Sequence, residues 1–141
     1  MQVVFERQDL VRFGHCDPAG IVYFPRYFEM LNALIEDWFT EGLGVNFAEF
    51  TGTRRMGIPT VHLTTHFKQV SRVGDRLTQR IAIQKLGHSS LVLNTVFEAS
   101  DGVRVSFEHV VVCTSLETHR PIPFPPDLRS ALERAIGASH A

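Results

Sequence analysis

The residue best placed to do chemistry in this chain is Asp17, in the segment RFGHCDPAGIVYFPRYFEML that starts at Arg12. The run DPAG beginning at Asp17 has the residue preferences of a type I turn, with Asp first, Pro second and Gly fourth. Further along, Pro25 suits the first position of a helix, where its missing N–H costs nothing. A carboxylate near the free N–H groups of a helix N-terminus can attack a carbonyl carbon while those groups stabilise the charge on its oxygen.

A purely structural role for Asp17 is the alternative, because Asp before Pro often only hydrogen-bonds the backbone of its own turn. The neighbourhood favours the chemical role, since residues 21–24, which include Tyr23, are apolar and can line a pocket between acid and helix. No G-x-S-x-G motif is present, and Cys16 has no obvious base, so we expect an inert thiol there. Alternation along an extended segment predicts that His15 shares the side of Asp17 and could touch the site, whereas Cys16 points away.

The histidines do not indicate a metal site. His62 and His66 have the i, i+4 spacing of a zinc pair, but their run is rich in β-branched residues and predicts a strand. On a strand the two side chains would lie ~13 Å apart, too far for one metal ion. His109 and His119 stand alone, and we expect them to be structural or surface residues.

A polar turn later in the chain is a second candidate for binding. The run GHSS, with His88, Ser89 and Ser90, opens on a glycine and can donate several hydrogen bonds to a phosphate. A plain polar hairpin turn is the alternative for the same residues.

The elements that must position these residues follow from hydrophobic periodicity. From Pro25 to Glu41 apolar residues recur at spacings of three and four, which predicts a helix of ~17 residues, about 25 Å long. Gly42 and Gly44 are expected to end it. Because the helix is apolar on most sides, other structure must wrap it.

The rest of the chain is predicted to be mainly β. Strands are expected at residues 3–13, 60–70, 77–86, 91–99 and 103–114, with a hairpin turn at Asp101 and Gly102. We expect the later strands to form an antiparallel meander, residues 45–58 to be a connection, and residues 127–136 to form a short helix. One helix cannot cover both faces of a sheet, so a curved sheet around the helix is favoured, with exposed edges that favour dimerisation.

Composition limits the class of protein. The 141 residues fit a single domain covering residues 1–141, and 44% hydrophobic with 21% charged residues are typical of a globular protein. The formal charge of −1 argues against nucleic acid as a partner. No apolar run reaches the ~18 residues of a membrane span, and the N-terminus lacks the apolar core of a signal peptide. Two distant cysteines fit reduced thiols, so we expect a cytoplasmic protein with no membrane contact.

The stretch FGHCDPAGIVYFPRYFEML resembles the signature of the 4-hydroxybenzoyl-CoA thioesterase group of hotdog-fold acyl-CoA thioesterases. The resemblance implies an α+β hotdog fold, in which a curved antiparallel sheet wraps one long central helix. It also implies a homodimer or homotetramer, with active sites at the subunit interface that hydrolyse an acyl-CoA substrate. CoA is then part of the substrate, and no separate cofactor is expected.

The resemblance also implies roles for residues around the long helix. The matching acid is Asp17, acting as nucleophile or as general base toward water, and the matching oxyanion donor is the backbone N–H around Phe24. The family member compared has an acid at the position of Asn32, where the acyl ring is expected.

The CoA nucleotide would lie near the turn at residues 87–90, which makes His88, Ser89 and Ser90 candidate contacts. The family member has a basic cluster at this turn, and here Lys85 or Arg72 are further candidates for phosphate binding.

Several alternatives stay open at this point. Aromatic, short-chain and medium-chain acyl groups all remain, as does an acyl-carrier protein in place of CoA. The alternative in a different class is a non-hydrolytic acyl-CoA or acyl-carrier-protein binding module on the same fold. A hotdog dehydratase would need a histidine paired with an acid across the dimer, for which only His15 offers itself. A purely structural dimer is a further alternative, in which the Asp17 turn would have no function.

Overall fold

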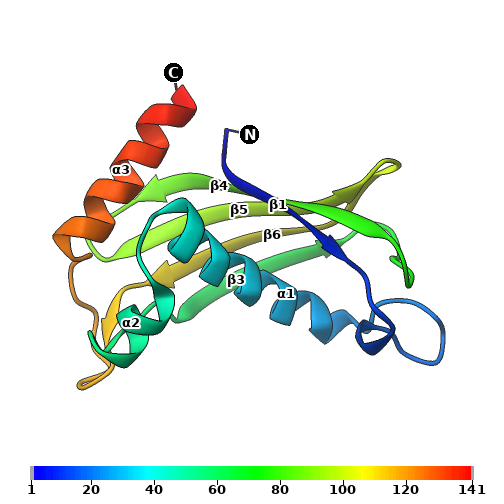
Figure 1. Cartoon of the computed structure of the whole chain (residues 1–141), viewed down its shortest axis with the longest axis horizontal. Helices are drawn as coiled ribbons and strands as arrows, with labels where there is room; N and C mark the ends of the chain where they lie inside the picture. The colour runs from blue at the N-terminus through cyan, green and yellow to red at the C-terminus, as the bar shows by residue number, and fades with distance from the viewer. Residues whose placement is uncertain (1, 141) are drawn as a thin grey trace.

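The computed structural model of the chain describes the backbone of residues 2–140 and the side chains of residues 2–138. One antiparallel sheet of five strands has the order β1-β4-β5-β6-β3. Its strands are β1 (Val3–Leu10), β3 (Thr60–Phe67), β4 (Arg76–Leu86), β5 (Ser90–Ala99) and β6 (Gly102–Val112). Figure 1 shows this sheet curving around the long helix α1 (Phe24–Asp37), which lies across one face. The α+β hotdog fold expected from the sequence is confirmed.

Burial of one helix face holds α1 on the sheet. Its buried residues recur at spacings of three and four, as the sequence pattern predicts; they are Tyr27, Met30, Leu31, Leu34 and Ile35. The ring of Tyr27 lies 6.3 Å from that of Phe97 on β5, and the ring of Phe28 lies 6.1 Å from that of Phe107 on β6. Each fully buried apolar side chain contributes about 1.5–3 kcal/mol. This packing holds α1 against the inner face of the sheet.

The long helix ends in an irregular turn. Beyond α1 the chain continues as a π-helical turn over Trp38–Gly42, where the N–H of Leu43 donates to the carbonyl of Trp38 at 2.8 Å. The helix expected over residues 25–41 therefore spans α1 and this turn. Gly44, with φ +71°, adopts the left-handed backbone that closes the run.

The strand order corrects one expectation. Strands β4, β5 and β6 form the predicted meander, but β3 pairs with β6 rather than with β4 and becomes an edge strand. The segment between β3 and β4 therefore crosses the end of the sheet. Arg104 on β6 holds this crossing, since its guanidinium donates to the carbonyl of Val70 at 2.9 Å, to Ser71 Oγ at 3.1 Å and to Asp75 at 2.8 Å.

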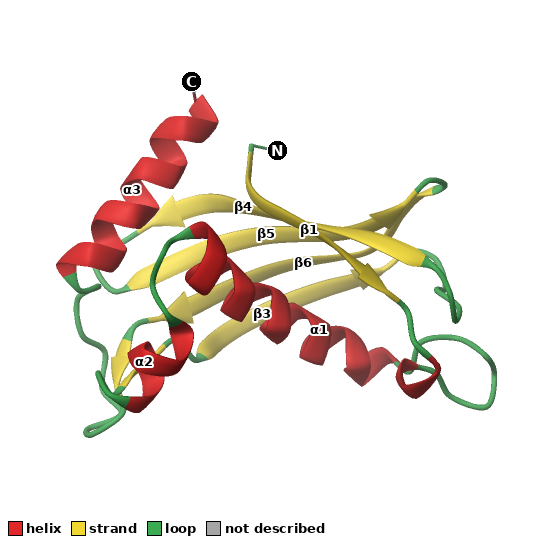
Figure 2. Ribbon diagram, viewed as in Figure 1, coloured by secondary structure: helices red, strands yellow, loops and turns green. Residues whose placement is uncertain are grey.

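Several smaller elements differ from the predicted ones. Residues expected to be a plain connection contain the helix α2 (Phe47–Gly52) and the two-residue strand β2 (Met56–Gly57), which pairs with β7 (Thr114–Ser115). The terminal helix α3 (Pro126–His140) is longer than the predicted 127–136, and β1 ends at Leu10 rather than at residue 13. Figure 2 shows α2 and α3 at one end of the sheet and the loop before α1 at the other. No helix among the described residues is both long and apolar enough to cross a membrane.

Gly42 provides a test of the packing where the long helix ends. A Cβ at this position would lie 2.7 Å from Trp38 Cδ1 and 2.9 Å from Phe5 Cδ1, and Trp38 is fully buried. We expect Gly42→Ala to lower the free energy of unfolding by about 1–3 kcal/mol, measured by urea denaturation, because the rings must move.

The matched control is Gly137→Ala on α3, where a Cβ meets no atom within 4 Å. This variant should be as stable as the wild type or slightly more so. Equal unfolding midpoints for both variants and the wild type would contradict the packing described at Gly42.

Candidate active site

Asp17 lies in a small hairpin that runs directly into α1. The N–H of Asp17 donates to the carbonyl of Ile21 at 3.0 Å, and the N–H of Tyr23 donates to the carbonyl of His15 at 2.9 Å. The N–H of Gly20 closes the turn on the carbonyl of Asp17 at 2.9 Å, and Gly20 has φ +81°. The backbone of the acid is therefore tied to the residue that precedes the helix.

The carboxylate of Asp17 is half-buried and only partly engaged. Its Oδ1 accepts a hydrogen bond from the N–H of Ala19 at 2.9 Å, which is the local contact that a structural role would require. No other donor among the described residues bonds this carboxylate. Asp17 lines an open hollow of about 400 Å³ together with Phe13 and Val73, so an oxygen remains available to a ligand.

The residues before Asp17 do not alternate as expected. Phe13–His15 form a short 3-10 helix in place of an extended segment. His15 turns back, and its Nδ1 accepts the N–H of Arg12 at 2.9 Å. Cys16, not His15, lines the hollow with Asp17, and its Sγ lies 3.6 Å from the carbonyl of Arg12. The prediction that His15 shares the side of Asp17 and Cys16 points away is wrong, because the 3-10 turn breaks the two-residue period.

The start of α1 presents a free backbone donor. The helix begins at Phe24, so Pro25 is its second residue and not, as predicted, its first. No side chain caps this end, and the N–H of Phe24 has no partner among the described residues. The rings of Tyr23 and Phe24 are exposed, and Phe24 lines an apolar groove of about 250 Å³ with Phe67. An unpaired N–H at the positive end of a helix can stabilise an oxyanion.

The candidate CoA contacts lie at opposite ends of the sheet. Leu10 pairs with Arg76, so the start of β4 adjoins the Asp17 loop, and Arg72 lies at this end in a bridge to Ile21. The eleven residues of β4 then lead to the opposite end of the sheet, about 35 Å away in an extended strand. Lys85 lies there, with the turn residues His88, Ser89 and Ser90.

The turn at residues 87–89 is held from outside the hairpin. Its backbone accepts three hydrogen bonds: to Gly87 from Arg129 of α3 at 3.0 Å, to His88 from the N–H of Phe124 at 3.2 Å, and to Ser89 from the N–H of Cys113 at 2.7 Å. The side chain of His88 stays exposed. Within one chain, Asp17 and this turn therefore lie at opposite ends of the sheet.

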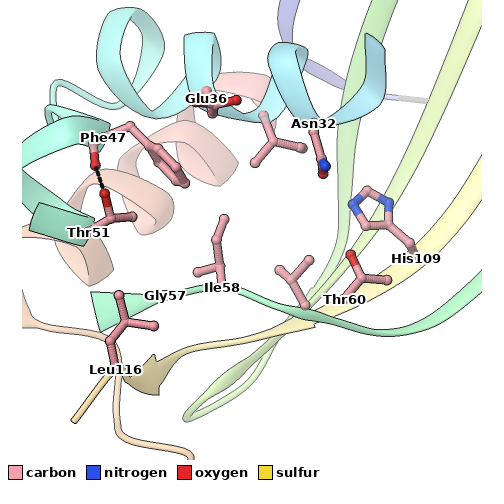
Figure 3. A pocket seen from close by; sticks show the side chains of 11 residues that line it. Asn32, Glu36, Phe47, Thr51, Gly57, Ile58, Thr60, His109 and Leu116 are labelled. Atoms are coloured by element: carbon pink, nitrogen blue, oxygen red, sulfur yellow. Dashed lines mark hydrogen bonds between the residues drawn. The ribbon is translucent and has the colours of Figure 1, made fainter. Parts of the chain in front are cut away.

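A cavity that sequence reasoning missed lies between α1, α2 and the start of β3. Its volume is about 340 Å³, and its lining residues are Asn32, Ile35, Glu36, Phe47, Thr51, Gly57, Ile58, Thr60, His109, Val111 and Leu116. Figure 3 shows Asn32 on α1 and His109 on β6 facing one another at one side of this space.

His109 is the unusual residue of the cavity. It is 1% exposed, its Nδ1 is buried without a hydrogen-bond partner, and burial lowers its pKa to about 4. The imidazole is therefore neutral at pH 7. The sequence carried a signal for this placement, because Val105, Phe107 and Val111 share its strand face and are buried. A histidine in the middle of such an apolar face must lie inside the protein.

Known proteins agree with this architecture. A family model described as the thioesterase-like superfamily matches residues 11–132. A 1,4-dihydroxy-2-naphthoyl-CoA hydrolase of Thermosynechococcus vestitus is 28% identical over 91% of this chain and 88% of its own length. A 4-hydroxybenzoyl-CoA thioesterase of Pseudomonas sp. (strain CBS-3) is 33% identical over 60% of this chain and 61% of its own. The solved structure of the gentisyl-coenzyme A thioesterase BH1999 is 28% identical, with a TM-score of 0.81 over 90% of this chain and 98% of that one.

The lowered pKa of His109 predicts a pH dependence of stability. Between pH 6.5 and 4 the unfolded chain binds a proton on this histidine that the folded chain does not. The free energy of unfolding should therefore fall as the pH drops through this window, by a total on the order of 3 kcal/mol. We expect His109→Gln to flatten this part of the profile, measured by urea denaturation from pH 7 to pH 4.5.

The control for this experiment is His88→Gln, which removes an exposed histidine. It should keep the slope of the wild type. A His109→Gln profile as steep as that of the wild type would show that His109 does not titrate as described.

Proposed function

The chain belongs to the thioesterase-like superfamily and is a thioester hydrolase, and we propose that its substrate is the CoA thioester of an aromatic acid. The observation that carries the proposed hydrolysis is the half-buried carboxylate of Asp17, which lies in a hairpin that runs into the uncapped start of α1. The relatives that support an aromatic acyl group act on naphthoyl, hydroxybenzoyl and gentisyl thioesters of CoA, according to their names. Short-chain and medium-chain acyl groups have no such support.

The reaction follows from two groups of this chain. The thioester carbonyl oxygen accepts the N–H of Phe24, which stabilises the charge that develops during attack. Asp17 attacks the carbonyl carbon, the C–S bond breaks to release the CoA thiolate, and water then hydrolyses the mixed anhydride. Alternatively, Asp17 removes a proton from the water that attacks the carbonyl directly. A thiolate is a good leaving group, so neither route needs a second acid.

The exposed edge strand β3 favours a homodimer. Its unpaired edge is accompanied by large apolar side chains at the surface, with Val61 61%, Leu63 39% and Phe67 52% exposed. Such an edge pairs readily with a second strand. Antiparallel pairing of the whole of β3 with its two-fold copy sets Thr60 opposite Phe67 of the partner subunit.

This pairing would bring two features of the site together. Within one chain the ring of Phe24 packs on that of Phe67 at 6.1 Å, so the start of α1 adjoins the far end of β3. Thr60 lines the cavity with Asn32 and His109. The helix start of one subunit would therefore lie beside the cavity of the other, which supports an active site at the subunit interface. A further pair of subunits, giving a homotetramer, would bring the turn of His88, Ser89 and Ser90 toward the CoA nucleotide.

Replacing the acid tests the proposed chemistry. Asp17→Asn keeps the shape of the side chain and its contact with Ala19 but removes the charge. We expect kcat to fall by at least ~100-fold, measured by a thiol-trapping dye on 4-hydroxybenzoyl-CoA, gentisyl-CoA and 1,4-dihydroxy-2-naphthoyl-CoA.

The matched control is Glu41→Gln, which neutralises an exposed carboxylate at the other end of the long helix. It should leave turnover near that of the wild type. Near-normal turnover in Asp17→Asn would refute the role of the acid. Binding of acyl-CoA by the wild type without release of thiol would favour a non-hydrolytic binding module, in which the contact with Ala19 is the whole role of Asp17.

A charge on the exposed edge tests the proposed dimer. Val61→Lys places an ammonium group on the edge strand that would pair, so sedimentation at micromolar concentration should show monomers where the wild type shows dimers or tetramers. Activity should fall together with assembly, because the acid and the cavity belong to different subunits. Val61→Thr keeps the β-branched shape and should assemble normally. A fully active, monomeric wild type would rule out the interface site.

A further inference from the structure

A buried arginine holds the segment that connects β3 with β4. Arg104 on β6 is 8% exposed, and it contacts this crossing segment, residues 68–75, through both its backbone and its side chain. Its carbonyl accepts the N–H groups of two residues, and its guanidinium donates to three others at 2.8–3.1 Å; the former are Lys68 and Gln69, and the latter are Val70, Ser71 and Asp75. Because a planar guanidinium presents its donors in a rigid fork, these bonds define the path of the segment.

Two carboxylates hold the guanidinium in place. Asp75 belongs to the crossing segment, whereas Asp101 lies in the turn between β5 and β6 and accepts at 3.1 Å from Nε of Arg104 and at 3.0 Å from Nη2. The hydrogen bond from Arg104, together with one from the N–H of Arg72, lowers the pKa of the Asp75 carboxyl, which is therefore charged at pH 7. A buried cation without such partners would carry a large free-energy cost.

The crossing segment in turn bonds both arms of the loop that carries Asp17. On the first arm, Val11 exchanges two backbone hydrogen bonds of 2.8 Å with residues 74–75. On the second arm, the N–H of Val22 donates to the carbonyl of Ser71 at 2.9 Å. Figure 1 shows the connection from β3 to β4 at the same end of the sheet as the loop before α1. The loop is therefore anchored on the segment that Arg104 holds.

Ser71 also links this segment to the long helix. Its side chain is fully buried and hydrogen-bonds Tyr27 in the first turn of α1; burial raises the pKa of Tyr27, and this bond opposes the shift. Because Ser71 Oγ also accepts the guanidinium of Arg104 at 3.1 Å, one hydroxyl joins the arginine to the helix. Arg104 is thus connected both to the loop of the acid and to the helix whose first N–H is the proposed oxyanion donor.

We propose that Arg104 is a positioning residue for hydrolysis, which acts through Asp75 and Ser71 to hold Asp17 at a fixed place relative to the start of α1. The inference rests on the proposed function. Arg104 is not among the residues that line the hollow of Asp17, whereas Val73 of the crossing segment is, so the arginine acts through that segment. A displacement of about 1 Å between reacting groups can lower turnover about 100-fold.

Two matched variants test this role, because each removes the charge of one carboxylate from the same guanidinium. The substrate is whichever of the three aromatic thioesters the wild type hydrolyses fastest. Asp75→Asn weakens the bond to the crossing segment, and we expect kcat to fall about 10-fold while KM changes by less than about 3-fold. Asp101→Asn weakens the bond to the turn between β5 and β6, and kcat should stay close to that of the wild type.

Replacing the arginine itself should have the larger effect. Arg104→Met removes every side-chain bond to the crossing segment, so kcat should fall about 100-fold. Arg104→Lys keeps the charge but not the fork of donors, and it should recover part of this loss.

Amide hydrogen exchange measures the position of the loop without turnover. In Asp75→Asn the N–H groups of Val11 and Val22, which bond the crossing segment, should exchange at least ~10-fold faster than in the wild type. In Asp101→Asn both should keep the rates of the wild type. This comparison also decides the inference where Arg104→Met does not fold.

Three outcomes would overturn the inference. The first is an unchanged kcat in a folded Arg104→Met variant. The second is an equal loss of kcat in Asp75→Asn and Asp101→Asn, since that indicates a general loss of structure. The third is unchanged exchange at Val11 and Val22 in Asp75→Asn. Each leaves the proposed hydrolase intact, whereas release of no thiol by the wild type from any of the three thioesters refutes the hydrolase itself.

Discussion

The candidate site depends on a short hairpin that ties Asp17 to the start of α1. Two backbone hydrogen bonds, from Asp17 to Ile21 and from Tyr23 to His15, bring the two arms of the loop together just before α1. The helix itself is held by its buried face, so the position of Asp17 depends on the packing of the core. In the role proposed for Asp17, a carboxylate on a backbone fixed in this way would lose little freedom when substrate binds, which is a condition for catalysis by proximity.

The sheet has a buried face and an exposed edge, and both matter for the proposed site. Its curved face covers α1, while β3 keeps an unpaired edge with exposed Val61 and Phe67. The crossing that places β3 at this edge is held by Arg104 and Asp75, whose carboxyl pKa is lowered mainly by its hydrogen bond from that guanidinium. Arg104 therefore fastens the crossing segment to β6 at the end of the sheet.

The sequence predicted the parts of this structure that local chemistry decides. Turn preferences at residues 17–20, the periodicity of α1 and the hairpin signal at Asp101 all depend on neighbours along the chain. The first turn and the helix are present, and the hairpin turn lies at Ser100 and Asp101, one residue earlier than predicted. Pairing of β3 with β6 depends on contacts far apart in sequence and was missed. The sides of His15 and Cys16 were exchanged because a single 3-10 turn shifts the alternation.

The cavity around His109 shows most clearly what one sequence does not reveal. Its walls come from helices and strands distributed from Asn32 to Leu116, and only the fold brings them together. Burial on an apolar strand face could have placed His109 inside the protein, but not beside Asn32. Only the folded structure shows that Nδ1 of His109 is buried without a hydrogen-bond partner among the described residues.

The most direct test is a crystal structure of the wild type with a non-hydrolysable thioether analogue of 4-hydroxybenzoyl-CoA that keeps the carbonyl group. Our expectation is a carbonyl oxygen about 3 Å from the N–H nitrogen of Phe24, with the carboxylate of Asp17 facing the carbonyl carbon. A carbonyl bound away from the start of α1, with Asp17 bonded only to Ala19, would contradict it.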